Sequence, residues 1–417
     1  MAVVTWDGSS STDFATAANW NTGSVPTSSD DVIIPDTSSI NDCVLDGDRT
    51  INSLQIQGNG SFSMNDHDLT IAGENSSGRA LDIGNSTVTF VGGTGTLIFT
   101  LGSGSTKLVG TQHIVASTEL RNLQFNGAAT FVMNGAMTVN GNLTITTGTL
   151  STSSDNNHAL TVTGDCTLNG GTFTGNASTV SHGSLTISSG TYNASSGTTT
   201  LNGTVDVGMR VDGTFNNNDG TFVIDGSITK VQMGSIGGAP TGFSINNAPF
   251  HHLTINDSIN FAWATGTLFN VEGDLTVAAG QTLGANNENS GIKVLGDVTL
   301  NGTLGNSNLT NDCEFGSLLI ASGGTYSATS GTTTITNEKS GHAWKNNGGT
   351  FTHNNGKVLF DFDTGNLSSD TEVKENTFYD LEVKLDSTGN ELRLEDHSSA
   401  NAMDILNNLT VTKGIFD

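Results

Sequence analysis

Basic residues are scarce in this chain. Lysine and arginine number 14 against 40 aspartates and glutamates, which leaves a formal net charge of −26. A surface this negative repels phosphate backbones, so we do not expect the protein to bind nucleic acid. The same charge keeps a strand-rich chain soluble and opposes association through unpaired strand edges.

Long apolar runs and a secretory leader are also missing. No apolar stretch approaches the roughly 18 residues that a membrane-spanning helix needs, so no membrane span is expected. The opening residues, MAVVTWDGSS, contain neither the basic region nor the apolar region of a signal peptide. Any exit from a cell would then use another route, such as lysis.

Cysteines and aromatic residues are few. The three cysteines, Cys43, Cys166 and Cys313, are an odd number and lie far apart, so they form neither a disulfide framework nor a metal knuckle. Aromatic residues make up 6% of the chain, too few for thick, ring-filled cores. Leu, Ile, Val and Phe nevertheless recur at short intervals, which excludes a disordered chain and favours many thin β layers.

A five-residue phrase recurs along the chain: two Asx, Gly or His residues (Gly-Ser in one case), then Leu-Thr-Ile or a close variant. Alternation of apolar, Thr and apolar residues after a turn former predicts a short strand with Thr outward. The phrase occurs at residues 67–71, 141–145, 164–168, 183–187, 251–255, 273–277, 296–300 and 407–411.

A longer repeat lies above this phrase. Gly141 and Gly164 recur as Gly273 and Gly296, each 132 residues later. The segments SGTYNASSGTTTLNG (189–203) and GGTYSATSGTTTITN (323–337), which we call the twin segments, belong to the same series. We therefore predict repeats of about 130 residues near 121–252 and 253–380, with an incomplete copy at 381–417. The alignment places Cys166 opposite Val298, which predicts that Cys166 is a small buried core residue.

These patterns predict an all-β fold, a parallel β-helix (β-solenoid) with an N-terminal cap. Successive phrases lie 23 and 19 residues apart, close to one coil each, which implies about 20 coils. A string of β-sandwich domains of about 130 residues each is the alternative.

The two ends of the chain differ from its middle. We assign residues 1–60 to an N-terminal cap or attachment segment and 61–417 to the solenoid. Trp6 and Trp20, two of four tryptophans, fit a cap over the first coil, or a surface that docks onto a partner. Asp417 falls part-way into a repeat, so we expect further residues or another subunit to cover that end.

Acidic clusters occur, but none recurs with a basic residue at fixed spacing, so no catalytic dyad or triad can be assembled. We therefore expect no enzyme activity. Asp361 and Asp363 in DFDTGN are the best candidates for a calcium site, against the simpler interpretation of a solvated acidic turn. No other cofactor is indicated. His251 and His252 are adjacent, so on a strand they would point to opposite faces, in a structural or surface role.

Two groups of motifs carry a resemblance to known proteins. They are Trp6-Asp7-Gly8 with Asn19-Trp20, Pro26 and Asp31-Val32-Ile33-Ile34-Pro35, and the F-x-x-L-x-I starts at 250–255 and 378–383. These motifs resemble β-solenoid surface adhesins of bacteria and repeats in structural proteins of marine phage virions.

The resemblance implies a fibre or spike on the virion surface that projects from the particle and contributes to host attachment. It also implies a homotrimer, contacts to other virion proteins through the N-terminal region, and a glycan or protein of the host surface as the partner. A bacterial extracellular adhesin and a polysaccharide-degrading tailspike are the alternatives.

Overall fold

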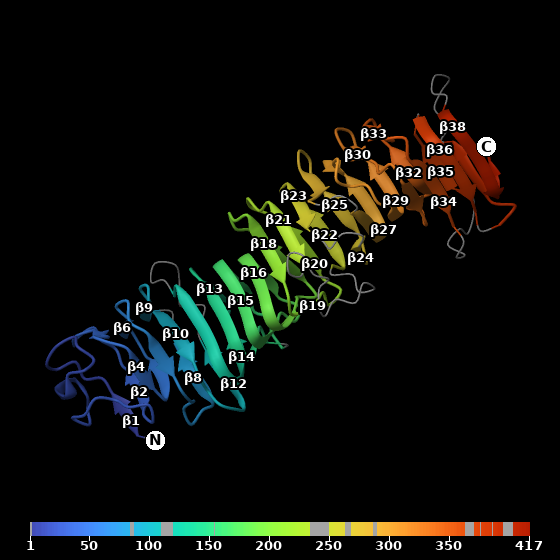
Figure 1. Ribbon diagram of the computed structural model, residues 1–417. Coiled ribbons are helices and arrows are strands. Elements are labelled where there is room, and N and C mark those ends of the chain that lie inside the picture. The colour runs from blue at the N-terminus through green and yellow to red at the C-terminus, as the bar shows by residue number, and fades with distance from the viewer. Residues whose placement is uncertain are drawn as a thin grey trace. The chain divides into compact units, whose positions relative to one another are not determined.

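The computed structural model describes residues 2–83, 87–109, 120–153, 155–233, 250–262, 268–286, 290–362, 371–375, 377–385, 387–394 and 403–417. The ribbon of the described chain consists almost entirely of strands (Figure 1). The chain divides into two compact units. Unit 1 comprises Met1–Gly203 and Gly213–Asn218, and unit 2 comprises Thr204–Asp212 and Asp219–Asp417.

Unit 1 is built from parallel strands of 2 to 15 residues and a single 3₁₀ turn, η1 (Ala17–Asn19), within its described residues. Its strands are β1 (Val3–Thr5), β2 (Asp31–Ile34), β3 (Cys43–Val44), β4 (Arg49–Ile51), β5 (Ser53–Ile56), β6 (Ser61–Ser63), β7 (Leu69–Ile71), β8 (Arg79–Asp82), β9 (Thr89–Val91), β10 (Thr96–Phe99), β11 (Ser105–Val109), β12 (Asn122–Asn134), β13 (Met137–Val139), β14 (Leu143–Ser151), β15 (Leu160–Thr174), β16 (Thr179–Asn193), β17 (Thr198–Leu201) and β19 (Thr214–Asn216).

Unit 2 has the same construction, and its described residues contain no helix. Its strands are β18 (Val207–Val211), β20 (Thr221–Ile224), β21 (Lys230–Met233), β22 (His252–Ile255), β23 (Ile259–Ala262), β24 (Leu268–Val271), β25 (Leu275–Val277), β26 (Thr282–Ala285), β27 (Gly291–Leu300), β28 (Thr303–Leu304), β29 (Cys313–Ile320), β30 (Thr325–Ser327), β31 (Thr332–Ile335), β32 (His342–Asn346), β33 (Thr350–Thr352), β34 (Lys357–Asp361), β35 (Thr371–Lys374), β36 (Thr377–Lys384), β37 (Glu391–Leu394), β38 (Asp404–Lys413) and β39 (Ile415–Phe416).

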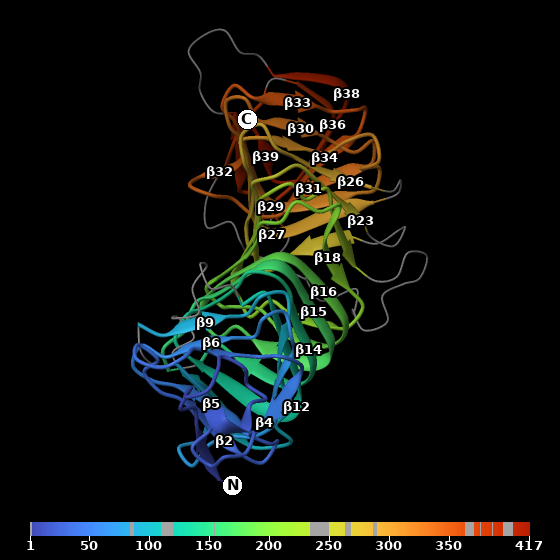
Figure 2. The ribbon, with the colours of Figure 1, turned by 90° about the vertical axis from the view of Figure 1, so that its left-hand side faces the viewer.

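Strands of successive coils pair in parallel, which confirms the predicted β-solenoid. In unit 1 Leu143 pairs with Cys166, and Cys166 with Leu185, so the recurring phrase stacks on itself. Figure 2 shows β12, β14, β15 and β16 in this succession. In unit 2 Leu275 pairs with Val298 in the same way. The sandwich alternative is wrong, because the strands of such domains run antiparallel to their neighbours.

The described strands form about 14 turns, fewer than the 20 expected from the spacing of the phrase. The expectation failed because coil length varies with the loops between strands. Cys166 and Leu185 stack 19 residues apart, whereas Thr221 and His252 stack 31 residues apart.

The core of each unit consists of columns of like side chains. Cys166 is fully buried, as the alignment with Val298 predicted. The rings of Phe173, Tyr192 and Phe215 stack on three successive coils of unit 1, with centroids 4.8 and 5.7 Å apart. Like residues stack because parallel pairing places equivalent positions of each coil directly above one another, about 4.8 Å apart.

Aromatic residues gather at the start of unit 1. Trp6 packs edge-on against Trp20 with centroids 5.0 Å apart, and Phe14 also packs edge-on against Trp20, at 4.8 Å. All three side chains are buried, and the indole N–H of Trp20 donates to the carbonyl of Phe14 (2.8 Å). These rings form a buried cluster at the start of unit 1, and that they cap the first coil stays a prediction. With both indoles buried, a docking partner would have to contact other residues. Parallel pairing already begins at β1, inside the segment assigned to the cap.

The last described coil of unit 2 exposes side chains that are buried elsewhere. Leu409 and Val411 are 48% and 45% exposed, whereas their partners on the preceding coil, Leu381 and Val383, are buried. No described strand packs against the other side of β38 at these positions.

Candidate functional site

A column of polar side chains runs beside the core of unit 1, one residue before the inward residue of each phrase. We call it the Asx column. At four steps of the column a side-chain oxygen accepts the backbone N–H of the residue stacked on it. The bonds join Asp48 to Asp68 (3.0 Å), Asp68 to Thr96 (2.8 Å), Asn122 to Asn142 (3.4 Å) and Asn142 to Asp165 (2.9 Å).

The Asx column recurs in unit 2. His252 accepts the N–H of Asp274 through Nδ1 (3.0 Å), and Asp274 accepts the N–H of Asp297 (2.9 Å). Asp297 then accepts the hydroxyl of Ser317 (2.6 Å). The column explains why an Asx or His residue precedes Leu-Thr-Ile in the sequence, since its oxygen or nitrogen satisfies a backbone donor at the sheet edge.

Glycines stand beside this column because there is no room for a side chain. A Cβ on Gly164 would lie 2.6 Å from the carbonyl oxygen of Gly141, and one on Gly296 would lie equally close to that of Gly273. Real Cβ atoms do not approach backbone this closely, so the Gly-Asx pair of the phrase is set by coil stacking.

The twin segments place one tyrosine each in the core. Tyr192 and Tyr326 are fully buried, and each lies seven residues before a threonine, Thr199 and Thr333 respectively. The hydroxyl of Tyr326 lies 2.8 Å from Oγ1 of Thr333, and that of Tyr192 lies 2.8 Å from Nε2 of His182. Each tyrosine hydroxyl thus has a polar partner inside the core.

The twin segments also form the same coil corner. The hydroxyls of Ser195 and Thr329 accept the N–H of the glycine two residues on, at 2.9 and 3.0 Å. Each donates to a carbonyl on the preceding coil, that of Ser178 and Thr310 respectively.

The coil that follows each twin segment binds the corner in the same manner in both copies. Asn218 donates through Nδ2 to the carbonyl of Ala194 (2.9 Å), and Asn354 to that of Ala328 (2.7 Å). Both asparagines have a positive φ, near 48°, which Asn tolerates better than most residues. The conspicuous residues of the twin segments are therefore used in contacts between coils.

The three cysteines are buried in the core. Burial raises the pKa of Cys313 to about 11 and raises those of Cys43 and Cys166 as well. A thiol held protonated inside a core is a poor nucleophile and a poor metal ligand.

The predicted calcium ligands are only partly described. Asp361 accepts from the ammonium of Lys384, its register partner on the next coil, at 3.0 and 3.2 Å. That lysine partly neutralises the carboxylate. Asp363 lies outside the described residues, so a calcium site at this pair stays a prediction.

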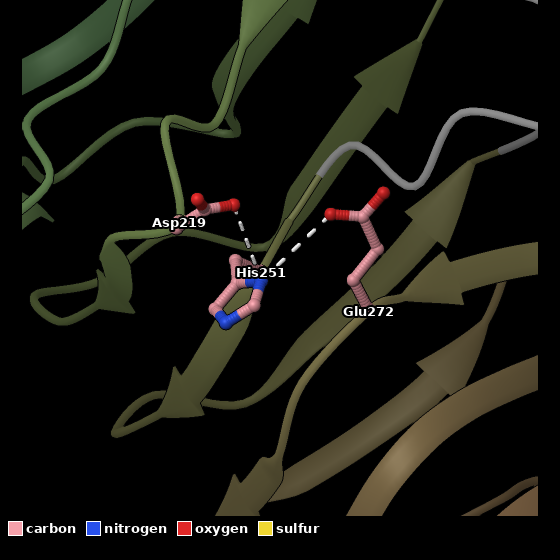
Figure 3. Close-up of side chains that lie close together, drawn as sticks. All are labelled: Asp219, His251 and Glu272. Atoms are coloured by element: carbon pink, nitrogen blue, oxygen red, sulfur yellow. Dashed lines mark ion pairs between the residues drawn. The ribbon is translucent and has the colours of Figure 1, made fainter.

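Three side chains of metal-binding type converge in unit 2 (Figure 3). Nδ1 of His251 lies 3.7 Å from a carboxylate oxygen of Asp219 and 3.8 Å from one of Glu272. One potential ligand atom from each of the three residues lies within 4.8 Å of the other two. Nδ1 is shielded from solvent and makes no hydrogen bond to any described residue.

This cluster was not anticipated from the sequence, and the expectation that His251 and His252 point to opposite faces is wrong. Strand β22 begins at His252, so His251 sits in the preceding bend, where strand alternation does not apply. The two rings meet edge to face with centroids 4.4 Å apart. Aligning the chain coil by coil would have placed His251 beside Glu272 and beside Gly220, the residue that follows Asp219.

A polar pocket of about 200 Å³ lies over β1, β2, β5 and β8 of unit 1. Asp82 on its wall is nearly buried and accepts from Arg79 (2.6 Å) and Gln55 (2.9 Å). The guanidinium and the amide therefore compensate this carboxylate.

No protein-family model, curated protein or solved structure matches this chain. The resemblance to phage and adhesin repeats thus rests on its sequence motifs. Among the described residues, no helix has the length and apolar character needed to cross a lipid bilayer.

Proposed function

We propose that the protein is a structural component of a surface appendage, a phage fibre or spike that projects from the particle and contributes to attachment to the host. The observation that supports this proposal is that both twin segments use their polar side chains in the same way, to hold the solenoid together. Their tyrosines, threonines and corner hydroxyls are hydrogen-bonded within and between coils in both copies. Side chains used in stacking extend the solenoid, which suits a spacer.

The remaining parts of the proposal follow from charge and from the resemblance. A net charge of −26 disfavours nucleic acid as a partner. A homotrimer on the virion surface, joined to other virion proteins through the N-terminal region and facing a host glycan or protein, is the arrangement the resemblance implies.

Immunogold electron microscopy of phage particles from the source of the gene tests the location. Antibodies against the full chain are expected to label appendages on the particles. Labelling of the envelope of uninfected cells, with none on particles, would replace the proposal with a bacterial adhesin.

A second experiment separates attachment from cleavage. The full chain is incubated with host cells and with their purified surface polysaccharide, and bound protein and new reducing ends are measured. Binding without reducing ends is expected. Release of reducing ends would identify a polysaccharide-degrading tailspike. The oligomeric state is tested separately by analytical ultracentrifugation of the full chain, and sedimentation as a monomer would contradict the homotrimer.

A further inference from the structure

We infer that Asp219, His251 and Glu272 bind one divalent transition-metal ion of the zinc class, which links three successive coils of unit 2. This inference is independent of the appendage proposal, because it concerns what the cluster binds and not where the protein is located.

The backbone brings the three residues together from three successive coils. The N–H of His252 donates to the carbonyl of Gly220 (3.2 Å), which stacks the coil of His251 on the coil of Asp219. The N–H of Glu272 donates to the carbonyl of Phe250 (2.9 Å), which stacks the next coil on that of His251. The central imidazole therefore lies between one carboxylate from each neighbouring coil (Figure 3).

The separations suit a shared ion better than direct hydrogen bonds. At 3.7 and 3.8 Å, the carboxylate oxygens are too far from Nδ1 to accept a hydrogen bond from it. Two ligand atoms on a tetrahedral zinc ion, each about 2.1 Å from the metal, lie about 3.4 Å apart. Shifts of a few tenths of an ångström would bring both carboxylates to that distance from Nδ1. Rotation of the two carboxylates can produce these shifts, since the side chains of Asp219 and Glu272 are 84% and 40% exposed.

The shielded Nδ1 of His251 is the second observation that points to a ligand. A ring nitrogen without a hydrogen-bond partner is costly when it is shielded from water. A metal ion between Nδ1 and the two carboxylates would satisfy the nitrogen and offset the negative charge of both neighbours.

Comparison with the following repeat shows that the scaffold does not need these residues. Asn355 and Tyr379 occupy the positions equivalent to Asp219 and His251. Asn355 has the same left-handed backbone conformation as Asp219, with φ of 59° against 57°. The coil corner at Asn355 thus has the same backbone conformation as the corner at Asp219 but lacks the Asp and His side chains. The fold of this corner therefore does not depend on the metal-binding residues.

The donor set selects the class of metal. Calcium and magnesium prefer shells of oxygen ligands, whereas imidazole with carboxylates suits zinc, cobalt and nickel. Three protein ligands leave at least one coordination position for water. This chemistry differs from the oxygen-only calcium site predicted at Asp361 and Asp363.

The test is a titration of the full chain, stripped with EDTA, with ZnCl₂ in a calorimeter and with CoCl₂ followed by absorption spectroscopy. We expect one ion per chain at this site and a cobalt spectrum typical of nitrogen and oxygen ligands. His251→Tyr and Asp219→Asn install the residues of the following repeat, and Glu272→Gln keeps the shape of the side chain. Each should weaken zinc binding by at least about tenfold while leaving the circular dichroism spectrum unchanged.

Asp225→Asn is the matched control, because it removes an exposed carboxylate from the coil of Asp219. It should bind zinc as the unmodified chain does. Absence of zinc binding by the unmodified chain would overturn the inference. So would binding that Asp225→Asn weakens as much as His251→Tyr, because that pattern indicates diffuse attraction to an acidic surface.

Discussion

The hydroxyl of Tyr326 lies 2.8 Å from Oγ1 of Thr333, and both side chains are buried in the core of unit 2. In unit 1 the buried hydroxyl of Tyr192 lies 2.8 Å from Nε2 of His182 instead. In both units a polar partner thus allows a tyrosine to occupy a core position without an unsatisfied hydroxyl.

Removing either hydroxyl of the Tyr326–Thr333 pair is expected to destabilise the protein, and the effects of the two substitutions should not add. Thr333→Val leaves a buried tyrosine hydroxyl without this partner and should lower the free energy of unfolding by about 1–3 kcal/mol, more than Tyr326→Phe at about 1 kcal/mol. The double variant should lose less than the sum, and urea unfolding of all four proteins measures the coupling. Strict additivity would show that the two hydroxyls do not interact.

His182 should make unit 1 sensitive to acid. Its Nε2 lies 2.8 Å from the hydroxyl of Tyr192, and burial lowers its pKa from 6.5 to about 3. In the unfolded chain His182 therefore becomes protonated near pH 6.5, whereas in the folded chain it stays neutral at that pH. Stability contributed by neutral His182 is present above pH 6.5 and is lost as the pH falls toward 3, by about 1.4 kcal/mol per pH unit at most.

His182→Phe tests this directly, because Phe315 occupies the equivalent position in unit 2. The ring of Phe315 lies edge to face with Tyr326 at 5.6 Å, much as His182 does with Tyr192 at 5.8 Å. The variant should fold and show a flatter loss of stability between pH 6.5 and about pH 4 in thermal melts. Identical pH profiles for the two proteins would contradict a neutral, buried His182.

The glycine of the recurring phrase should not tolerate a side chain. In Gly164→Ala the new Cβ would meet the carbonyl of Gly141 at 2.6 Å, and backbone cannot yield as a side chain can. We expect a loss of about 1–3 kcal/mol in the free energy of unfolding. Gly102→Ala is the control, since a Cβ on Gly102 would have no atom within 4 Å and the φ of this residue is not left-handed. Equal urea midpoints for the two variants would refute the packing argument.

The Asx column should depend on its acceptor atoms and not on charge. Asp274→Ala removes the oxygen that accepts the N–H of Asp297 at 2.9 Å and should cost about 1 kcal/mol. Asp274→Asn retains an acceptor and should stay within about 0.5 kcal/mol of the unmodified chain. Thermal melts at low and high salt separate the two effects, because screening changes a charge contribution and leaves the hydrogen bond. An equal loss in both variants would assign the role to charge.

Much of the architecture could be predicted from local patterns. Apolar, Thr, apolar alternation predicted the strands, and the coincidence of Gly141 with Gly273 and of Cys166 with Val298 predicted stacked, equivalent coils. These predictions succeeded because a solenoid repeats one local environment, so each coil must satisfy the same steric and hydrogen-bonding demands. The number of coils could not be predicted from the spacing of the phrase, because loops of different length change the number of residues per turn without changing the strands.

The sequence by itself determined the fold class, the repeat and the burial of Cys166, because each depends on residues that recur at fixed spacing. Only the tertiary structure decided which polar residues meet. Asp219, His251 and Glu272 come from three coils of unequal length, so their convergence depends on stacking and not on their spacing along the chain. The partner of Tyr326 was likewise decided by the path of the coil corner, which brings Thr333 back to a hydroxyl seven residues earlier.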